Sequence, residues 1–269
     1  MRYKDFEGPV EELVQLKLQE IEKAEQVKIL HAVESGSRAW GFASPDSDYD
    51  VRFIYVREEE YYLRLEDTKD FIDWELDEVL DINGWDVRKA LQLFHKSNAS
   101  IFEWANSPIV YQTTEEWKKI YQVGKTYFSK KIGMYHYFGM AKHNYYQYLQ
   151  QEYVNYKKYF YVLRPILACK WIDEKGCPPP VLFDELKESM LNREIRMVVD
   201  EILEEKKKRK ESETGVAAPK LNDYLLEQIQ YYSQLIPSLN EERKSGWSEL
   251  NQIFQSNLSI ESRKDSFVK

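Results

Sequence analysis

Hydrophobic positions in the first hundred residues switch between helical and strand spacing. Five apolar residues near the start recur at the helical interval and predict an amphipathic helix: Val10, Leu13, Val14, Leu18 and Ile21. Apolar, β-branched runs at 27–34 and 51–56 predict two buried strands, and a further strand pair is expected within about 70–83. This order predicts a small α/β unit.

From about residue 114 the apolar spacing becomes helical throughout. One face is traced by Met134, Phe138, Ala141, Tyr145, Tyr148 and Leu149, and a second by Tyr156, Phe160, Leu163 and Leu167. Pro165 predicts a kink in the second helix, and the run 177–180 predicts its end. We expect a flexible loop at 215–219, helices near 220–236 and 241–254, and a frayed final dozen residues.

These patterns predict an α+β protein, with a mixed-sheet α/β domain at 1–108 and an all-helical domain at 109–269. Of the 269 residues 43% are hydrophobic and 14% aromatic, which is ample for a core. The net charge of −8 permits a nucleic-acid partner but does not favour one. The basic run Lys206–Lys210 has glutamates on both sides, so we interpret it as a solvated mixed-charge helix.

The remaining composition predicts a cytoplasmic protein with no membrane segment. The N-terminus carries no apolar signal region, and no run approaches the roughly 18 apolar residues of a membrane span. Cys169 and Cys177 match no metal or redox spacing and are expected to be buried structural thiols. The four histidines lack a zinc spacing; His31 is interpreted as a hydrogen-bonded core residue and His143 as a weaker candidate for substrate contact.

A glycine turn follows the first predicted strand. Gly36 lets the backbone approach a ligand, and the N–H groups of the next turn, with the Ser37 hydroxyl, can donate to an anion such as phosphate. Arg38 is either a further phosphate contact or a surface residue. Trp40 and Phe42 are interpreted as packing anchors.

Two carboxylates open the second predicted strand. Asp48 and Asp50 share a face because side chains alternate along a strand, and such a pair favours a hard cation, Mg²⁺ or Mn²⁺, which also binds substrate phosphates. Ser47 is expected to cap or orient this turn. Arg52 falls on the same face, where it either lies near a polyphosphate or is a solvent-exposed strand residue.

The order strand, Gly36-Ser37, ten residues, Asp48-Tyr49-Asp50, strand resembles the signature of the DNA polymerase β nucleotidyltransferase superfamily. The resemblance implies a third carboxylate on a later strand. We favour Asp81 over Asp73, Asp77 and Asp86, because Asp86 precedes apolar residues at helical spacing and is better explained as a helix N-cap.

A narrower resemblance covers most of residues 27–210. Several runs are similar to the RNA repair pathway branch of that superfamily: 81–91, 96–98, 101–104, 140–144 and 158–165. Ala99 departs from the proline expected after Asn98. The resemblance implies nucleotidyl transfer as the chemistry and does not specify the acceptor substrate.

Basic and aromatic residues of the helical half are candidates for nucleotide binding. Lys157, Tyr161 and Arg164 recur at i, i+4 and i+7 and are expected to share one surface suited to a triphosphate and base. Lys142 on the preceding helix is expected to join them, and Lys158 is a competing phosphate ligand. Each lysine taken alone is more simply a solvated side chain.

The combined hypothesis is metal-dependent nucleotidyl transfer. Asp48, Asp50 and Asp81 would hold metal, a nucleoside triphosphate would be the substrate, and the acceptor hydroxyl could belong to an RNA end, a small molecule or a protein. The alternative is a nucleotide-binding regulatory or toxin-neutralising subunit with the same fold and no catalysis. The base preference and the oligomeric state stay open.

Overall fold

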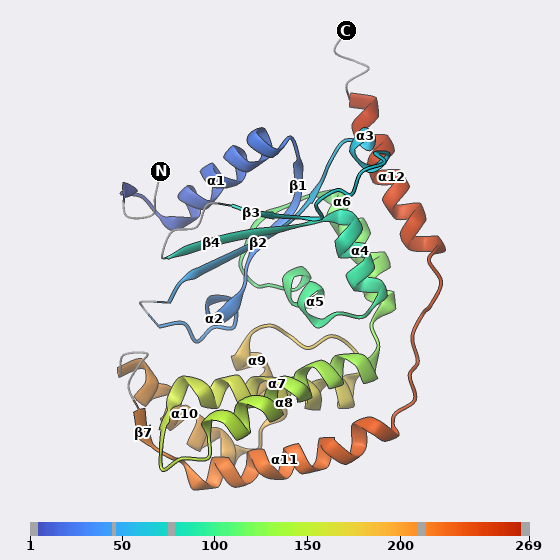
Figure 1. Cartoon of the computed structure of the whole chain (residues 1–269). Coiled ribbons are helices and arrows are strands. Elements are labelled where there is room, and N and C mark those ends of the chain that lie inside the picture. Colours follow the sequence, from blue (N-terminus) through green and yellow to red (C-terminus); the bar gives the residue numbers. More distant parts are fainter. Residues whose placement is uncertain (1–4, 45–46, 75–78, 209–213, 265–269) are drawn as a thin grey trace.

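The computed structural model describes residues 5–44, 47–74, 79–208 and 214–264. A sheet with helices on both faces forms one half of the molecule, and a layer of helices lies beneath it (Figure 1). Within the described ranges, none of the helices combines the length and apolar character needed to cross a bilayer.

The sheet-containing half is built from five strands and the helices around them. Its elements are α1 Val10–Glu25, β1 Lys28–Glu34, α2 Gly36–Ala39, β2 Tyr49–Val56, α3 Glu59–Tyr62, β3 Phe71–Asp73, β4 Leu80–Asp86, α4 Val87–His95, α5 Ala99–Ala105, β5 Val110–Thr113 and α6 Glu115–Gly124. The opening helix, both apolar strands and the strand pair expected near 70–83 are confirmed.

The sheet is mixed, as the sequence predicts, with the strand order β3-β4-β2-β1-β5. Strand β2 lies antiparallel to β1 and parallel to β4, and the parallel register places Asp50 opposite Asp81. The outer strand β5 pairs antiparallel with β1. The first residues of β2 and β4 therefore meet at the edge of the sheet where β1 ends.

Apolar side chains cover both faces of this sheet. One cluster joins α1 to Val51, Phe53 and Tyr55 of β2, and a second joins Ile54 and Val56 to helices α4, α5 and α6. Because alternate residues of one strand supply the two clusters, β2 is buried on both faces along most of its length. Asp50 lies at the end of this buried segment.

The helical half packs around α7 and α8. Its elements are α7 Lys130–Tyr148, β6 Tyr153–Asn155, α8 Tyr156–Lys175, α9 Phe183–Met190, α10 Arg193–Lys208, β7 Thr214–Val216 and α11 Pro219–Ser238. The flexible loop expected at 215–219 is wrong: residues 214–216 pair with β6, and Pro219 begins α11. The glycine that favoured a loop instead gives room, because a side chain on Gly215 would overlap the Tyr156 ring.

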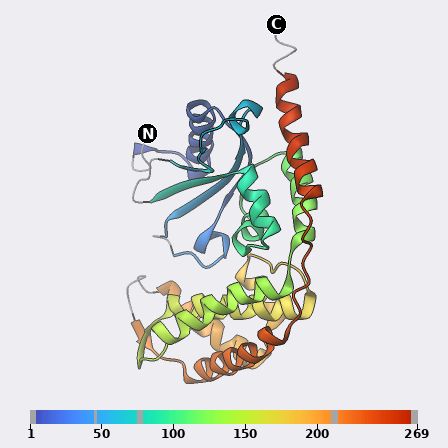
Figure 2. The ribbon, with the colours of Figure 1, turned by 45° about the vertical axis from the view of Figure 1, so that its right-hand side comes forward.

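The last helix returns to the sheet-containing half. Helix α12, Ser248–Lys264, lies beside α4 and α6 (Figures 1 and 2) and buries Leu250 and Leu258 in their cluster. Strand β5 also lies beyond residue 108 and belongs to the sheet. The sheet-containing half therefore does not end at the expected domain boundary, residue 108.

Candidate functional site

The glycine turn lies directly against the Asp50 side chain. Gly36 follows β1 with φ +61°, a left-handed conformation that favours glycine, and a Cβ there would overlap Oδ2 of Asp50. Ser37, in the same short helix α2, is half-buried. The Gly36-Ser37 turn is thus placed directly beside a carboxylate of the Asp-x-Asp motif.

Asp50 and Asp81 are brought together across the parallel strands β2 and β4. Arg52 lies on the same face, and its Nη2 contacts Asp50 Oδ1 at 3.0 Å and Asp81 Oδ2 at 2.8 Å. Its Nη1 donates to the backbone carbonyls of Val51 and Asp81. The single guanidinium holds one oxygen of each carboxylate, so Arg52 is not a solvent-exposed strand residue.

Several candidate groups act on the pKa of Asp50 through their charges. Burial raises the pKa of Asp50, Arg52 opposes that rise, and Asp81 and Asp48 add to it. Lys157, from the helical half, also lowers the pKa of Asp50 through its charge. Two carboxylates, one arginine and one lysine therefore act on the Asp50 carboxyl group.

Arg38 supports the turn that carries Asp48. Its guanidinium donates to the carbonyls of Ser47 at 2.5 Å and Asp48 at 3.1 Å, and it stacks on the Tyr49 ring at 3.6 Å. Ser47 is buried, and its hydroxyl accepts the N–H of Ser44. Ser47 thus organises the turn as expected, and Arg38 contacts the turn rather than open solvent.

The competitors for the third carboxylate occupy other positions. Asp86 caps α4 by accepting the Arg88 N–H, as the sequence predicts, and is buried against the Tyr62 hydroxyl. Asp73 lies on β3, where it accepts a hydrogen bond from Asn83. Asp77 lies outside the described residues. Asp81 is the candidate that the register places opposite Asp50.

Glu34, which sequence reasoning missed, is a fourth carboxylate at this edge. Its side chain is 1% exposed; Oε1 accepts the backbone N–H of Asp50 at 2.8 Å, and Oε2 accepts the Tyr111 hydroxyl at 2.6 Å. Burial raises the pKa of Glu34. Its position as the last residue of a strand of apolar neighbours is the signal that could have identified it.

Lys157, Lys158 and Tyr161 gather on α8. The ammonium groups lie 5.7 Å and 5.2 Å from the centre of the Tyr161 ring, and Lys158 is also 4.1 Å from that of Tyr148. Tyr161 in turn meets Trp40 edge-on, with the ring centres 6.0 Å apart. This group of α8 residues therefore adjoins the segment that carries the glycine turn.

Arg164 is turned away from that group, and Lys142 lies on the neighbouring helix α7. Arg164 is 2% exposed, pairs with Glu103 at 3.0 Å, and lies over the Trp40 ring. The expectation that it shares one substrate-facing surface with Lys157 is not met, because the Arg164 guanidinium is buried between Glu103 of α5 and the Trp40 ring. Lys142 is exposed on α7, with its ammonium near the Phe138 ring.

The segment after the glycine turn is anchored in the helical half. Phe42 is buried against Phe160 and Phe183, which confirms its packing role, and Lys206 donates to the Phe42 carbonyl and the Ser44 hydroxyl. Lys206 is buried, so the solvated position expected for it is wrong. His31 is confirmed as a core residue that hydrogen-bonds Thr113 and the Trp104 carbonyl.

The donor chemistry of this edge fits a hard divalent cation. Carboxylate oxygens from two strands are adjacent, and Mg²⁺ needs only one or two carboxylates when waters and substrate phosphates complete its shell. Among the described residues no group of three or more His, Cys, Asp or Glu side chains forms a complete metal cage. The arrangement therefore suits a metal shared with a substrate.

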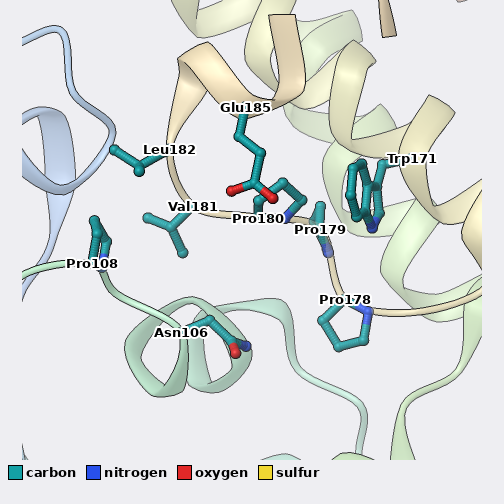
Figure 3. Close-up of a pocket in the computed structure, with 9 residues that line it drawn as sticks. All are labelled: Asn106, Pro108, Trp171, Pro178, Pro179, Pro180, Val181, Leu182 and Glu185. Atoms are coloured by element: carbon teal, nitrogen blue, oxygen red, sulfur yellow. The ribbon is translucent and has the colours of Figure 1, made fainter. Parts of the chain in front are cut away.

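A separate cavity of about 300 Å³ lies between the two halves. Its lining combines Asn106 and Pro108 with Trp171, the proline run 178–180 and Glu185 (Figure 3). None of the three candidate carboxylates lines it. This cavity is distinct from the edge where Asp50 and Asp81 meet.

A family model and a curated relative match most of the chain. The model of the RNA repair pathway DNA polymerase beta family matches residues 10–256. The chain is 42% identical over 241 residues to the uncharacterized protein YcgL of Bacillus subtilis (strain 168), covering 88% of this chain and 92% of that protein. A crystal structure of a nucleotidyltransferase-like protein from Exiguobacterium sibiricum 255-15 aligns over 96% of this chain and 92% of its own, with 11% identity and a TM-score of 0.31.

Proposed function

Because the chain belongs to the RNA repair pathway DNA polymerase beta family, we propose that it is a metal-dependent nucleotidyltransferase. It transfers a nucleoside monophosphate from a nucleoside triphosphate to a hydroxyl acceptor and releases pyrophosphate. The observation that carries the proposal is the meeting of Asp50 and Asp81 across parallel strands, directly beside the Gly36 turn.

The three carboxylates have separate roles in this proposal. Asp48 and Asp50 hold the divalent metal, which when bound supplies positive charge to the triphosphate oxygens. Asp81, which the register places beside Asp50, holds metal and accepts the proton of the acceptor hydroxyl. Arg52 keeps both carboxylates oriented by binding one oxygen of each and leaving the other available.

The basic residues position the other end of the triphosphate. Gly36 and Ser37 form the turn beside Asp50, the charge of Lys157 acts on the same carboxyl group, and Lys158 lies near the Tyr161 ring on α8. We assign the phosphates to Lys157 and the turn, and the base to Tyr161. Lys142 is a more peripheral contact of the same substrate.

The chemical step is an in-line displacement at the α-phosphorus. The acceptor oxygen forms a bond to that phosphorus, the bond to the bridging oxygen of the β-phosphate breaks, and pyrophosphate leaves with the electron pair. The acceptor's proton passes to Asp81. The adjoining turn and lysine stabilise the charge that gathers on the leaving group.

Transfer from an α-labelled triphosphate tests this proposal. The protein is incubated with each labelled triphosphate, Mg²⁺ or Mn²⁺, and separate RNA, protein and small-molecule acceptor pools, and labelled products are separated by size. Asp48→Asn with Asp50→Asn is expected to abolish labelling while the fold is retained. Asp200→Asn, a carboxylate of α10 that pairs with Lys187, is the matched control and is expected to label normally.

Two outcomes would contradict the proposal. Equal labelling by the double variant would remove the carboxylates from the reaction. Tight metal-dependent binding of triphosphate, with no acceptor labelled in any pool, would favour a non-catalytic nucleotide-binding subunit.

A further inference from the structure

Asp50 lies just past the end of a hydrogen-bonded strand pair. The ladder between β1 and β2 ends at the pair Glu34 and Val51, so Asp50 has no partner residue on β1. A buried peptide N–H without an acceptor is costly, on the order of 1–3 kcal/mol. The chain therefore needs another acceptor at this position.

The Glu34 side chain supplies that acceptor. Its Oε1 accepts the Asp50 N–H at 2.8 Å, while the Asp50 carbonyl accepts the N–H of Ser35 at 2.8 Å. Both polar backbone groups of Asp50 are thus bound by consecutive residues at the end of β1. The backbone of Asp50 is held in place before any ligand binds to its carboxylate.

Glu34 is itself held from three directions. Tyr111 of β5 donates to Oε2, Ser107 donates to the Glu34 carbonyl at 2.6 Å, and the Glu34 N–H donates to the carbonyl of Ile109. Gln15 of α1 donates to the Tyr111 carbonyl. With the side chain 1% exposed, Glu34 has no path to a substrate, so it can act only through its neighbours.

We propose that Glu34 is a positioning residue that fixes Asp50 for metal binding, acting through the hydrogen bond to the Asp50 N–H. This inference rests on the proposed function, because it gives Asp50 the metal-binding role. Residues behind a metal ligand typically change metal affinity or activity by roughly 10–100-fold when they are replaced. The effect expected at Glu34 lies in that range.

Three substitutions separate position from charge. Glu34→Gln keeps the oxygen that accepts the Asp50 N–H, and its amide can donate to the Tyr111 hydroxyl. Glu34→Asp keeps the charge but draws the carboxylate back by one methylene, away from Asp50. Glu34→Met keeps the length and removes the acceptor. Ser107→Ala is the matched control, because it removes a hydrogen bond to Glu34 without touching the Asp50 contact.

Mn²⁺ affinity, measured by electron paramagnetic resonance without nucleotide, is the main readout. We expect Glu34→Gln and Ser107→Ala to stay within about threefold of the native affinity, and Glu34→Asp and Glu34→Met to weaken it roughly 10–100-fold. Turnover is expected to follow the same order, with kcat falling more than the KM for triphosphate rises. If Glu34→Met does not fold, Glu34→Asp gives the same comparison.

Two results would overturn the inference. Unchanged Mn²⁺ affinity in Glu34→Asp would show that the hydrogen bond does not position Asp50. Equal weakening in Ser107→Ala and Glu34→Met at the same loss of stability would show a general structural effect. The proposed function fails separately, through native protein that binds Mn²⁺ but labels no acceptor.

Discussion

Gly36→Ala tests the contact between the glycine turn and the carboxylates. Gly36 has φ +61°, and an added methyl group would overlap Asp50 Oδ2. A non-glycine residue in the left-handed region costs about 1–2 kcal/mol. Since a folded domain of ordinary stability has roughly 5–15 kcal/mol in reserve, the variant is expected to remain folded.

The larger expected effect is on the site. The Asp50 carboxylate must retreat by roughly 1 Å to reach a normal van der Waals separation from the methyl group. Its other oxygen is held by Arg52 at 3.0 Å, so the retreat strains that ion pair. A displacement of about 1 Å at reacting groups can reduce the rate by around 10²-fold, which is about 2.7 kcal/mol of barrier.

The assay compares unfolding in urea with turnover of an α-labelled triphosphate. We expect Gly36→Ala to lose about 1–2 kcal/mol of unfolding free energy and roughly 100-fold in kcat. Gly139→Ala is the control, because a Cβ at Gly139 in α7 meets nothing within 4 Å. That change is expected to stabilise the helix by about 0.5–1 kcal/mol and leave turnover unchanged.

Native turnover in the Gly36→Ala protein would refute this prediction. Such a result would mean that Asp50 either moves freely or takes no part in the reaction. A loss of turnover fully explained by unfolding, with native kcat for the folded fraction, would also contradict it.

Three further predictions concern the third carboxylate, the core and the loop anchor. Asp81→Asn should abolish transfer whereas Asp73→Asn on β3 should retain it, as measured with the labelled triphosphate; the reverse result would reassign the third carboxylate. Burial lowers the pKa of His31 from 6.5 to about 4, so between these pH values the unfolded chain binds a proton that the folded protein does not. The contribution of neutral His31 to the free energy of unfolding is therefore complete above pH 6.5 and is lost as the pH falls toward 4. In His31→Gln the unfolding free energy should therefore fall less between pH 6.5 and 4, by up to about 3 kcal/mol, than in the native protein. An unchanged pH dependence would argue against a neutral buried His31. Lys206→Met should cost about 1–3 kcal/mol in urea unfolding, because the Phe42 carbonyl and Ser44 hydroxyl lose their buried donor; native stability would show that another group replaces it.

The local elements were predictable because each has a short-range cause. The apolar period of α1 and the N-cap at Asp86 are properties of neighbouring residues, and the structure confirms them. Alternation along β2 also correctly placed Arg52 on the face of Asp50. Such patterns depend on the geometry of a single helix or strand, which the sequence determines directly.

Contacts between distant segments could not be predicted in the same way. Lys206 and Arg164 look like ordinary polar helix residues, yet each is buried by a partner more than 60 positions away or by an aromatic ring of the 40–42 segment. Glu34 gains its role only where the β1–β2 ladder ends. The charge and sequence spacing of these residues do not reveal their partners, because the packing of the two halves decides which polar groups are buried and need a hydrogen-bond partner.

Nucleotidyl transfer moves the α-phosphorus of the triphosphate to the acceptor, whereas phosphoryl transfer moves the γ-phosphorus. Parallel incubations with α-labelled and γ-labelled triphosphate, the same metal and the same acceptor pools distinguish nucleotidyl transfer from phosphoryl transfer and hydrolysis. We predict that label from the α position becomes bound to an acceptor, that label from the γ position leaves as pyrophosphate, and that Asp48→Asn with Asp50→Asn does neither. Acceptor carrying the γ label, or γ label released as orthophosphate alone, would contradict the account.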